Sequence, residues 1–410
     1  MNSKNESNFD IVIVGGGMVG ASMACLLRES PCRIALVDRV KFKQGVDQNK
    51  LDREKFDPRV SALTAVTKEI FSDLNVWADI ESARCCNYVD MHVWDADGTG
   101  SISFSAAELN QHELGTIVEN SVLSSALYKQ IAEQENLSLL APVSIDSLEN
   151  DSDEVTLLTE DGNRISSQLV IAADGANSKI RELCQIPTRE WDYNHQAIVT
   201  TVRTELPHQQ TALQRFIDTG PLAFLPLAAE PDDQSQKYCS IVWSAVPERA
   251  EQLMALSDSE FCSELTKSIE GRLGEIENCD KRYSFPLRQR HALDYVKDRV
   301  VLIGDAAHSI HPLAGQGVNL GFLDAVVLAK ELKHGSEVGR QLADPTVLSR
   351  YQRKRKGHNL GMMWLMEGFK HLFAEQALPI RWLRNLGMSG VDNVSAIKNH
   401  LARRAMGLDW

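Results

Sequence analysis

Short apolar runs, each followed within two residues by glycine, are the clearest hydrophobic pattern along this chain. Ile11–Val14, Leu169–Ala173 and Val300–Ile303 are uniformly apolar and rich in β-branched residues, as strands buried on both faces are. Helix-compatible sequence follows the first and third runs. The pattern predicts an α/β fold with a Rossmann-like, mostly parallel sheet.

A second pattern, typical of antiparallel strands, fills the sequence between these runs. Residues 88–104 alternate polar and apolar positions around an Asp-Gly pair. Residues 197–203, 222–227 and 238–245 predict further strands of a separate mixed sheet. Helices are predicted at 57–74 and 119–134, and helices dominate after residue 320.

The nucleotide-type elements therefore lie on both sides of an inserted sheet. We expect a discontinuous nucleotide-binding domain, an inserted mixed β-sheet substrate domain and a helical C-terminal segment. The expected bounds are 1–80, 115–185 and 290–345 for the first, 81–114 and 186–289 for the second, and 346–410 for the third.

The loop after the first run carries a dinucleotide-binding pattern. Gly15, Gly17 and Gly20 form G-x-G-x-x-G, and Asp38 follows 18 residues after Gly20 at the end of a second predicted strand. The glycines permit a tight turn, close approach of a diphosphate and close helix packing, while the acid can accept hydrogen bonds from ribose hydroxyls. A lone glycine pattern is weak evidence, but here the strand, helix, second strand and acid are all present.

The third run continues into Gly304-Asp305 and a loop containing Pro312, Gly315, Gln316 and Gly317, with a helix expected near Asn319. A strand, an acid, a glycine loop and a helix start can hold an extended, partly anionic ligand on backbone N–H groups. An ordinary strand-turn-helix of any α/β protein is the alternative.

Composition excludes several classes of protein. The 410 residues are 43% hydrophobic and 24% charged, which is ordinary for a globular protein. The eight cysteines form no CxxC pair, so we expect reduced thiols in the cytoplasm. We find no signal peptide and no apolar stretch long enough to predict a transmembrane helix.

The net charge of −13 is unevenly distributed. Residues 346–410 hold eleven Lys/Arg and four Asp/Glu, a net +7, which leaves −20 for the rest of the chain. Such asymmetry is typical of a surface that meets an anionic partner. The acidic body argues against nucleic acid, which leaves a lipid headgroup layer or an acidic protein.

Between the two motifs lies another, Ala173-Asp174-Gly175 followed by Arg181. The three motifs in this order resemble those of the FAD-dependent aromatic hydroxylases of the p-hydroxybenzoate hydroxylase class. Within that class, the stretches 57–63, 115–120 and 312–319 are similar to the ubiquinone-biosynthesis hydroxylases. Softer similarity at 93–95, 191–193 and 239–244 points to the branch of 2-polyprenylphenol 6-hydroxylases.

The resemblance implies a monooxygenase that binds FAD, is reduced by NAD(P)H, and uses O₂ as co-substrate. It implies transfer of one oxygen from a flavin C4a-hydroperoxide to the ring of a polyprenylphenol in ubiquinone biosynthesis. Two alternatives stay open. One is a hydroxylase of a small soluble aromatic acid, clamped by Arg203, Arg215, Arg288 or Arg290; the other is a non-catalytic flavoprotein subunit of a biosynthetic complex.

The resemblance also implies residue roles. Cofactor contacts are expected from Gly15, Gly17, Gly20, Asp38, Arg59, Asn120, Asp174, Asp305, Gly317, Val318 and Asn319. The catalytic residues are expected to be Pro312, Gly315, Gln316 and Gly317, in the loop at the flavin edge. Simpler alternatives are a surface arginine at Arg59, a helix cap at Asn120 and an Arg181 paired with Glu182 or solvent.

A water-excluding substrate pocket is expected from Phe216, Leu222, Phe224, Leu225 and Trp243, which could equally be sheet core. After residue 345 a basic cluster, Arg350, Arg353, Lys354, Arg355 and Lys356, precedes Met, Trp and Phe residues. This composition predicts a helix at a membrane surface, or alternatively a helical cap or oligomer interface. We therefore expect a cytoplasmic protein, peripheral at the inner face of the cell membrane. Its expected partners are the polyprenylated phenol, other ubiquinone-biosynthesis proteins and, in a homo-oligomer, a second copy.

Overall fold

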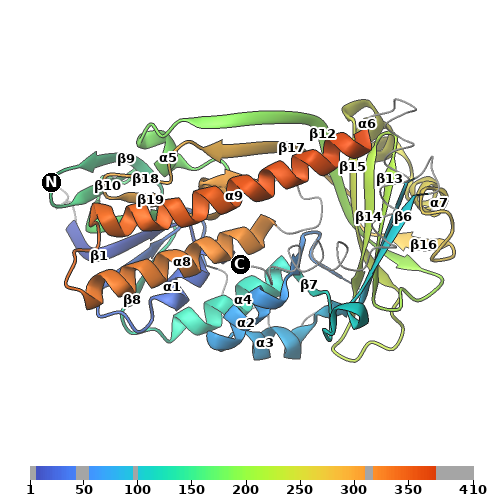
Figure 1. Ribbon diagram of the computed structural model, residues 1–410, viewed down its shortest axis with the longest axis horizontal. Coiled ribbons are helices and arrows are strands. Elements are labelled where there is room, and N and C mark those ends of the chain that lie inside the picture. The colour runs from blue at the N-terminus through green and yellow to red at the C-terminus, as the bar shows by residue number, and fades with distance from the viewer. Residues whose placement is uncertain (1–5, 43–54, 96–99, 310–316, 375–410) are drawn as a thin grey trace.

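The computed structural model describes residues 6–42, 55–95, 100–309 and 317–374, with side chains up to Trp364. In this part of the chain, strands form two large sheets and one small sheet, and helices cover them (Figure 1). Cofactor-type motifs and the antiparallel strands belong to different large sheets.

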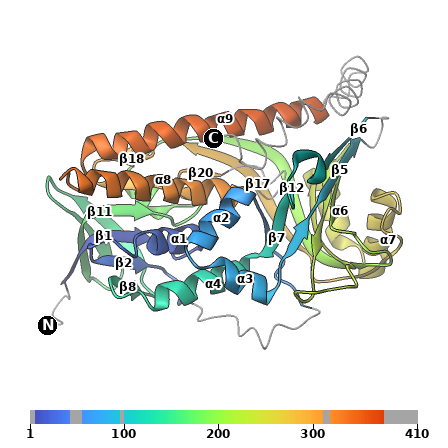
Figure 2. The same ribbon diagram turned by 60° about the horizontal axis from the view of Figure 1, so that its bottom comes forward.

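The first large sheet has a parallel centre in the order β19-β11-β1-β2-β8. Its apolar run Ile11–Val14 lies at the middle, buried on both faces, as predicted. Helix α1 packs against both α4 and α8 beside this sheet, and antiparallel strands extend the sheet (Figures 1 and 2). The bounds are β1 (Glu6–Val14), β2 (Ile34–Val37), β8 (Leu137–Leu140), β9 (Ile145–Asn150), β10 (Val155–Thr159), β11 (Arg164–Ala172), β18 (Val296–Lys297), β19 (Val300–Leu302), α1 (Met18–Leu26), α4 (Asn120–Ala132), α5 (Lys179–Leu183) and α8 (Gly317–Glu337).

The second large sheet is mainly antiparallel and follows the order β20-β17-β12-β15-β14-β13-β5-β6, with β16 paired to β12. Its long strands β12 and β17 pair with each other and extend toward the part of the molecule that holds the first sheet (Figure 1). Helices α6 and α7 cover one face around a separate apolar core. The bounds are β5 (Asp90–Asp95), β6 (Ser101–Ser105), β12 (Thr188–Thr204), β13 (Thr211–Ile217), β14 (Gly220–Leu227), β15 (Tyr238–Ala245), β16 (Ile276–Cys279), β17 (Tyr283–Ala292), β20 (His308–Ser309), α6 (Pro247–Ala255) and α7 (Asp258–Ser268).

A small sheet, β3-β7-β4, lies between the two large ones (Figure 2). Its Ala62 and Ile117 pack against Leu225 and Leu227 of the second sheet. The predicted helix at 57–74 is wrong in its first half, because Val60–Leu63 pairs antiparallel with β7 and the helix begins only at Ala65. The bounds are β3 (Val60–Leu63), β4 (Cys86–Tyr88), β7 (Gly115–Glu119), α2 (Ala65–Asp73), α3 (Trp77–Ala83) and the 3₁₀ turn η2 (Ala107–Leu109).

The last described element is the helix α9 (Pro345–Ala374), which packs along α8 and crosses the length of the molecule (Figure 1). No helix within the described ranges is both long and apolar enough to cross a membrane. The residue bounds expected for the separate domains stay a prediction.

Candidate functional site

The loop between β1 and α1 is shaped by backbone packing that excludes side chains at two positions. Gly15 has φ +105°, and a Cβ at Gly20 would lie 1.9 Å from the Gly15 carbonyl oxygen. Gly17, directly before α1, instead faces open space, with no atom within 4 Å of an ideal Cβ. The loop therefore leaves room for a ligand at the helix start, where unpaired backbone N–H groups favour a diphosphate.

Asp38 reaches this loop from the end of β2, as the sequence predicts for a ribose-binding acid. Its carboxylate accepts hydrogen bonds from the Gly16 amide at 2.6 Å and the Val40 amide at 2.8 Å. Two oxygens accept about four hydrogen bonds, so acceptor capacity remains for hydroxyls. Sequence reasoning missed Phe42 and Tyr128, whose rings meet edge to face 5.6 Å apart beside Gly16; the Tyr128 hydroxyl donates to the Gly16 carbonyl.

The third motif forms a 3₁₀ turn, η3 (Gly304–Ala306), that presents Asp305. The Asp305 side chain is exposed and makes no hydrogen bond to another described residue. Its pKa is raised, first because protein surrounds the carboxyl group, while His308 opposes and Asp324 adds to the shift. Because solvent reaches the Asp305 side chain, its oxygens can accept hydrogen bonds from a ligand. Such an acceptor suits the ribityl hydroxyls of FAD.

Gly304 is held from behind by a fully buried carboxylate that sequence reasoning missed. Asp324 of α8 accepts from the Gly304 amide at 3.0 Å and from His308 Nε2 at 2.6 Å. Its other oxygen accepts from Arg355 Nε at 2.7 Å and Asn359 Nδ2 at 3.1 Å, both on α9. Burial would raise the pKa of Asp324, but His308 and Arg355 hold it well below its usual value. The sequence feature that could have identified Asp324 is its position as an acid within the otherwise apolar run 320–328.

The prediction that the basic cluster of α9 forms a surface is therefore partly wrong. Arg355 is 3% exposed and pairs with Asp324, while Lys354 pairs with Glu331 at 2.6 Å. Lys356 donates to the Leu293 carbonyl and lies 3.6 Å from Asp294. Residues 354–356 of α9 therefore act as part of a cap on the first sheet, because these three cations are paired with acids or carbonyl groups of the protein.

Arg181 joins the second motif to the third. Its guanidinium donates to the Ala306 carbonyl and the Ala176 carbonyl, each at 2.8 Å. The alternative that Arg181 pairs with Glu182 or solvent is wrong, because the residue is 7% exposed and faces inward from α5. In the same motif, Asp174 accepts from the Ile180 amide at 3.2 Å.

The second oxygen of Asp174, Oδ1, is buried and has no partner among the described residues. Burial raises the pKa of this carboxyl group. A buried polar atom without a partner is costly and calls for a ligand group or water. Asp174 therefore fits a cofactor-side position, although its role stays a prediction.

Arg59 and Asn120 meet at the start of α4, where the Asn120 amide donates to the Arg59 carbonyl at 3.0 Å. The Asn120 side chain does not cap the helix; Asp57 does, accepting from the Ser121 amide at 3.0 Å. Asn120 Oδ1 instead accepts from Ser61 Oγ at 2.6 Å. The Arg59 side chain is exposed and contacts no described polar partner. Both roles toward the cofactor stay predictions.

A buried ion pair supports this junction and escaped sequence reasoning. Arg84 and Glu119 are 2% and 3% exposed, and Arg84 Nε lies 2.5 Å from Glu119 Oε2. Glu119 also accepts from the Asp57 amide at 2.6 Å. The pair fixes the loop that carries Arg59, because separating two buried charges is strongly unfavourable.

The start of α8 combines an open and an anchored position. Gly317 has no atom within 4 Å of an ideal Cβ, and Val318 follows it in the first turn. Asn319 is 3% exposed; it accepts from Thr67 Oγ1 at 2.7 Å and donates to the Ala62 carbonyl at 2.8 Å. Its side chain anchors the helix, which leaves only its backbone N–H for a ligand. Pro312, Gly315 and Gln316 lie outside the described residues.

The five residues predicted to line the substrate pocket fall on opposite faces of the second sheet. Leu222, Phe224 and Trp243 have no exposed surface and pack with α6 and α7, which matches the alternative of sheet core. Phe216 and Leu225 alternate with them and lie on the other face, where Leu225 packs against the small sheet. The substrate pocket stays a prediction, and of the five residues only Phe216 and Leu225 now support it.

That second face has further half-buried apolar members that sequence reasoning did not select. The pairing partners in register place them beside Phe216 and Leu225, since residues directly opposite on neighbouring strands share a face. They are Met91, Phe104, Val199, Pro221, Ala223 and Val242.

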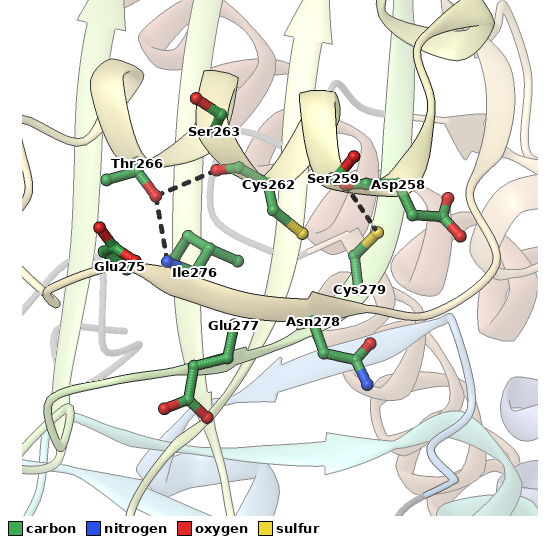
Figure 3. Close-up of a pocket in the computed structure, with 10 residues that line it drawn as sticks. All are labelled: Asp258, Ser259, Cys262, Ser263, Thr266, Glu275, Ile276, Glu277, Asn278 and Cys279. Carbon is green, nitrogen blue, oxygen red and sulfur yellow. Dashed lines mark hydrogen bonds between the residues drawn. The ribbon is translucent and has the colours of Figure 1, made fainter.

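A cavity of about 500 Å³ lies elsewhere, between α7 and β16, and contains none of the motif residues (Figure 3). Its polar groups are used locally: Thr266 donates to the Cys262 carbonyl and accepts from the Ile276 amide, both at 3.0 Å. All eight cysteines carry free thiols. Across the described residues, no three His, Cys, Asp or Glu side chains gather as metal ligands.

The FAD binding domain family matches residues 8–363. The 3-demethoxyubiquinol 3-hydroxylase of Escherichia coli (strain K12) is 34% identical over 399 residues, covering 97% of this chain and 98% of the relative. The ubiquinone hydroxylase UbiL of Rhodospirillum rubrum is 32% identical, covering 97% and 89%. The crystal structure of p-nitrophenol 4-monooxygenase PnpA from Pseudomonas putida DLL-E4 shares the fold, with TM-score 0.78 at 19% identity over 99% of both chains.

Proposed function

The chain belongs to the FAD binding domain family as an FAD-dependent aromatic-ring monooxygenase, and we propose that it hydroxylates the ring of a polyprenylated phenol in ubiquinone biosynthesis. The observation that carries this substrate class is the apolar second face of the nine-stranded sheet. Half-buried Phe216, Ala223, Leu225 and Val242 offer contacts to a hydrophobic ring and chain.

The residues around the three motifs suit the FAD part of this proposal. Bound FAD, reduced by NAD(P)H and reacting with O₂, supplies the oxygen transfer. The α1 start and Asp38 would bind the diphosphate and ribose, Asp305 would bind the ribityl chain, and the α8 start would direct backbone N–H groups to the flavin edge. The apolar face would exclude water from the reacting ring.

The alternative of a small aromatic acid needs a free cation to clamp a carboxylate. Each arginine considered for that role already has a partner. Arg215 pairs with Glu270 at 2.9 Å on the α7 side, and Arg290 pairs with Glu190 at 2.6 Å. Arg203 and Arg288 pair with Glu277 at 3.3 Å and Asp192 at 3.7 Å. The polyprenylated phenol is therefore the better-supported substrate, and association with a membrane surface and with other ubiquinone-biosynthesis proteins belongs to the same proposal.

Isotope labelling tests the reaction. The FAD-loaded chain, with NAD(P)H and ¹⁸O₂, is given a short-chain 2-polyprenylphenol and, in parallel, a 3-demethoxyubiquinol. We expect one ¹⁸O atom in the ring product of one substrate, detected by mass spectrometry. Label from water, or no product from any prenylated phenol in a complemented deletion strain, would contradict the proposal. Reductant-dependent oxygen uptake separates an enzyme from a non-catalytic flavoprotein.

A further inference from the structure

A positively charged groove of about 510 Å³ lies between α8 and α9, away from the motif residues. The two helices lie side by side in both ribbon views (Figures 1 and 2). Six side chains line the groove: Lys330, Glu331, His334, Arg350, Arg353 and Lys354.

The groove carries positive charge that the protein does not neutralise. Its acid, Glu331, is nearly buried and is satisfied by Lys354 at 2.6 Å. Lys330, Arg350 and Arg353 make no hydrogen bond or ion pair with any residue in the described part of the chain. Like charges held close on two packed helices repel one another, so a bound anion would stabilise this arrangement. The chain as a whole has a net charge of −13, so the positive charge of this groove is opposite in sign to that of the protein.

A large aromatic side chain continues the same face of α9. Trp364 is 73% exposed, the highest value among the exposed large hydrophobic residues of the described chain. It follows Arg353 by eleven residues, close to three helical turns, so both side chains project from the same side of the helix. Gly357 and Leu360 lie between them on that side, one exposed and one half-buried. Cations followed by tryptophan along one helix face are typical of a membrane interface.

We propose that the α8–α9 groove binds the phosphate of an anionic phospholipid headgroup, with Trp364 entering the interface of the bilayer. The guanidinium groups of Arg350 and Arg353 are suited to paired hydrogen bonds with phosphate oxygens. The inference rests on the proposed function in one respect, because a polyprenylated substrate resides in the bilayer. The cation that would have been most obvious from the sequence, Arg355, does not take part, since Asp324 holds it in the interior.

Vesicle flotation tests the groove directly. The FAD-loaded full chain is mixed with vesicles of phosphatidylglycerol and phosphatidylcholine, or of phosphatidylcholine alone. We expect binding to the anionic vesicles only, and a loss of roughly tenfold or more in the double variant Arg350→Gln/Arg353→Gln. Trp364→Ala should also weaken binding. The control Lys333→Gln/Lys267→Gln makes the same change in net charge at exposed positions outside the groove and should bind as the unaltered chain does.

Three results would overturn the proposal. These are equal loss of binding in the groove and control variants, no binding of the unaltered chain to anionic vesicles, and calorimetric binding of inorganic phosphate by the groove without vesicle binding. The last result would assign the groove to free phosphate. FAD content and hydroxylation of a short-chain phenol in detergent should be unchanged in the groove variants. Failure of the lipid site is therefore distinguishable from failure of the proposed reaction.

Discussion

The two large sheets differ in where their candidate functional residues lie along the strands. In the parallel sheet, Asp38, Asp174 and Asp305 follow the ends of strands, where loops meet helix starts. In the nine-stranded sheet, the residues that could meet a substrate lie in mid-strand and differ from core residues only in the face they occupy. Phe224 is fully buried while its neighbour Leu225 is half-buried on the opposite face.

The difference reflects how each sheet is covered. Parallel strands buried on both faces can hold a ligand only at their ends, so a short motif is enough to locate the site. An antiparallel sheet with α6 and α7 on one face keeps its other face for contacts. Register decides which residues belong to that face, and apolar composition alone does not distinguish the two.

The largest expected effect concerns the buried pair of Arg355 and Asp324, which holds the Gly304 turn in place. Arg355→Met removes the partner of a buried carboxylate and should lower the free energy of unfolding by about 3–5 kcal/mol, measured by urea denaturation. FAD retention should fall with it, because Asp324 holds the Gly304 amide. The matched variant Arg353→Met, on the exposed side of the same helix, should change stability by less than about 0.5 kcal/mol. Equal effects of the two variants would remove the distinction between buried and surface cations.

The two faces of the second sheet can be separated by neighbouring substitutions. Leu222→Ala creates a cavity against α6 and α7 and should cost about 2–5 kcal/mol of stability, with KM for the phenol unchanged. Ala223→Phe adds volume on the opposite face and should raise KM roughly tenfold, with a stability change below about 1 kcal/mol. Denaturation and steady-state kinetics measure both. A raised KM in the Leu222 variant alone would reverse the assignment of the faces.

Asp305 is expected to bind FAD without contributing to the stability of the fold, so its two effects can be measured separately. Asp305→Ala should weaken FAD binding by about 10- to 100-fold, since a charged hydrogen-bond acceptor is worth about 1.5–3 kcal/mol. Stability of the FAD-free chain should change little, because the Asp305 side chain has no described hydrogen-bond partner to lose. Fluorescence titration with FAD gives the affinity. Unchanged FAD affinity would exclude Asp305 from the site.

The last expected effect is a pH dependence of stability that comes from a buried histidine next to the motif. His291 is 2% exposed, and burial, aided by His308, lowers its pKa to about 4. The unfolded chain therefore binds this proton between about pH 6.5 and 4 while the folded chain does not, so stability falls as pH decreases through that window. His291→Gln should reduce the slope by up to about 1.4 kcal/mol per pH unit. The exposed His112→Gln should leave it unchanged; an equal change in both variants would contradict the buried origin.

Much of the fold was predictable because local patterns and tertiary environment agree. The helix at 119–134 was expected with Val122, Leu123, Ala126, Leu127 and Ile131 on its inner face, and these five residues are buried in α4. The stretch 57–63 was mistaken for helix because its pairing with β7 lies more than fifty residues away in sequence. Periodicity reports on neighbours within a few residues and carries no information about such a partner.

By itself, the sequence determined the nucleotide loop, the acids at the strand ends and the family to which the chain belongs, because glycine requirements and strand-end positions are local properties. Only the tertiary structure decided that Asp324 ties α9 to Gly304, that Arg181 reaches Ala306, and that Arg355 is an interior charge while Arg353 faces a groove. These outcomes depend on which helices pack together and in which rotation. Identical residue types therefore become structural or functional according to the desolvation that the packing imposes.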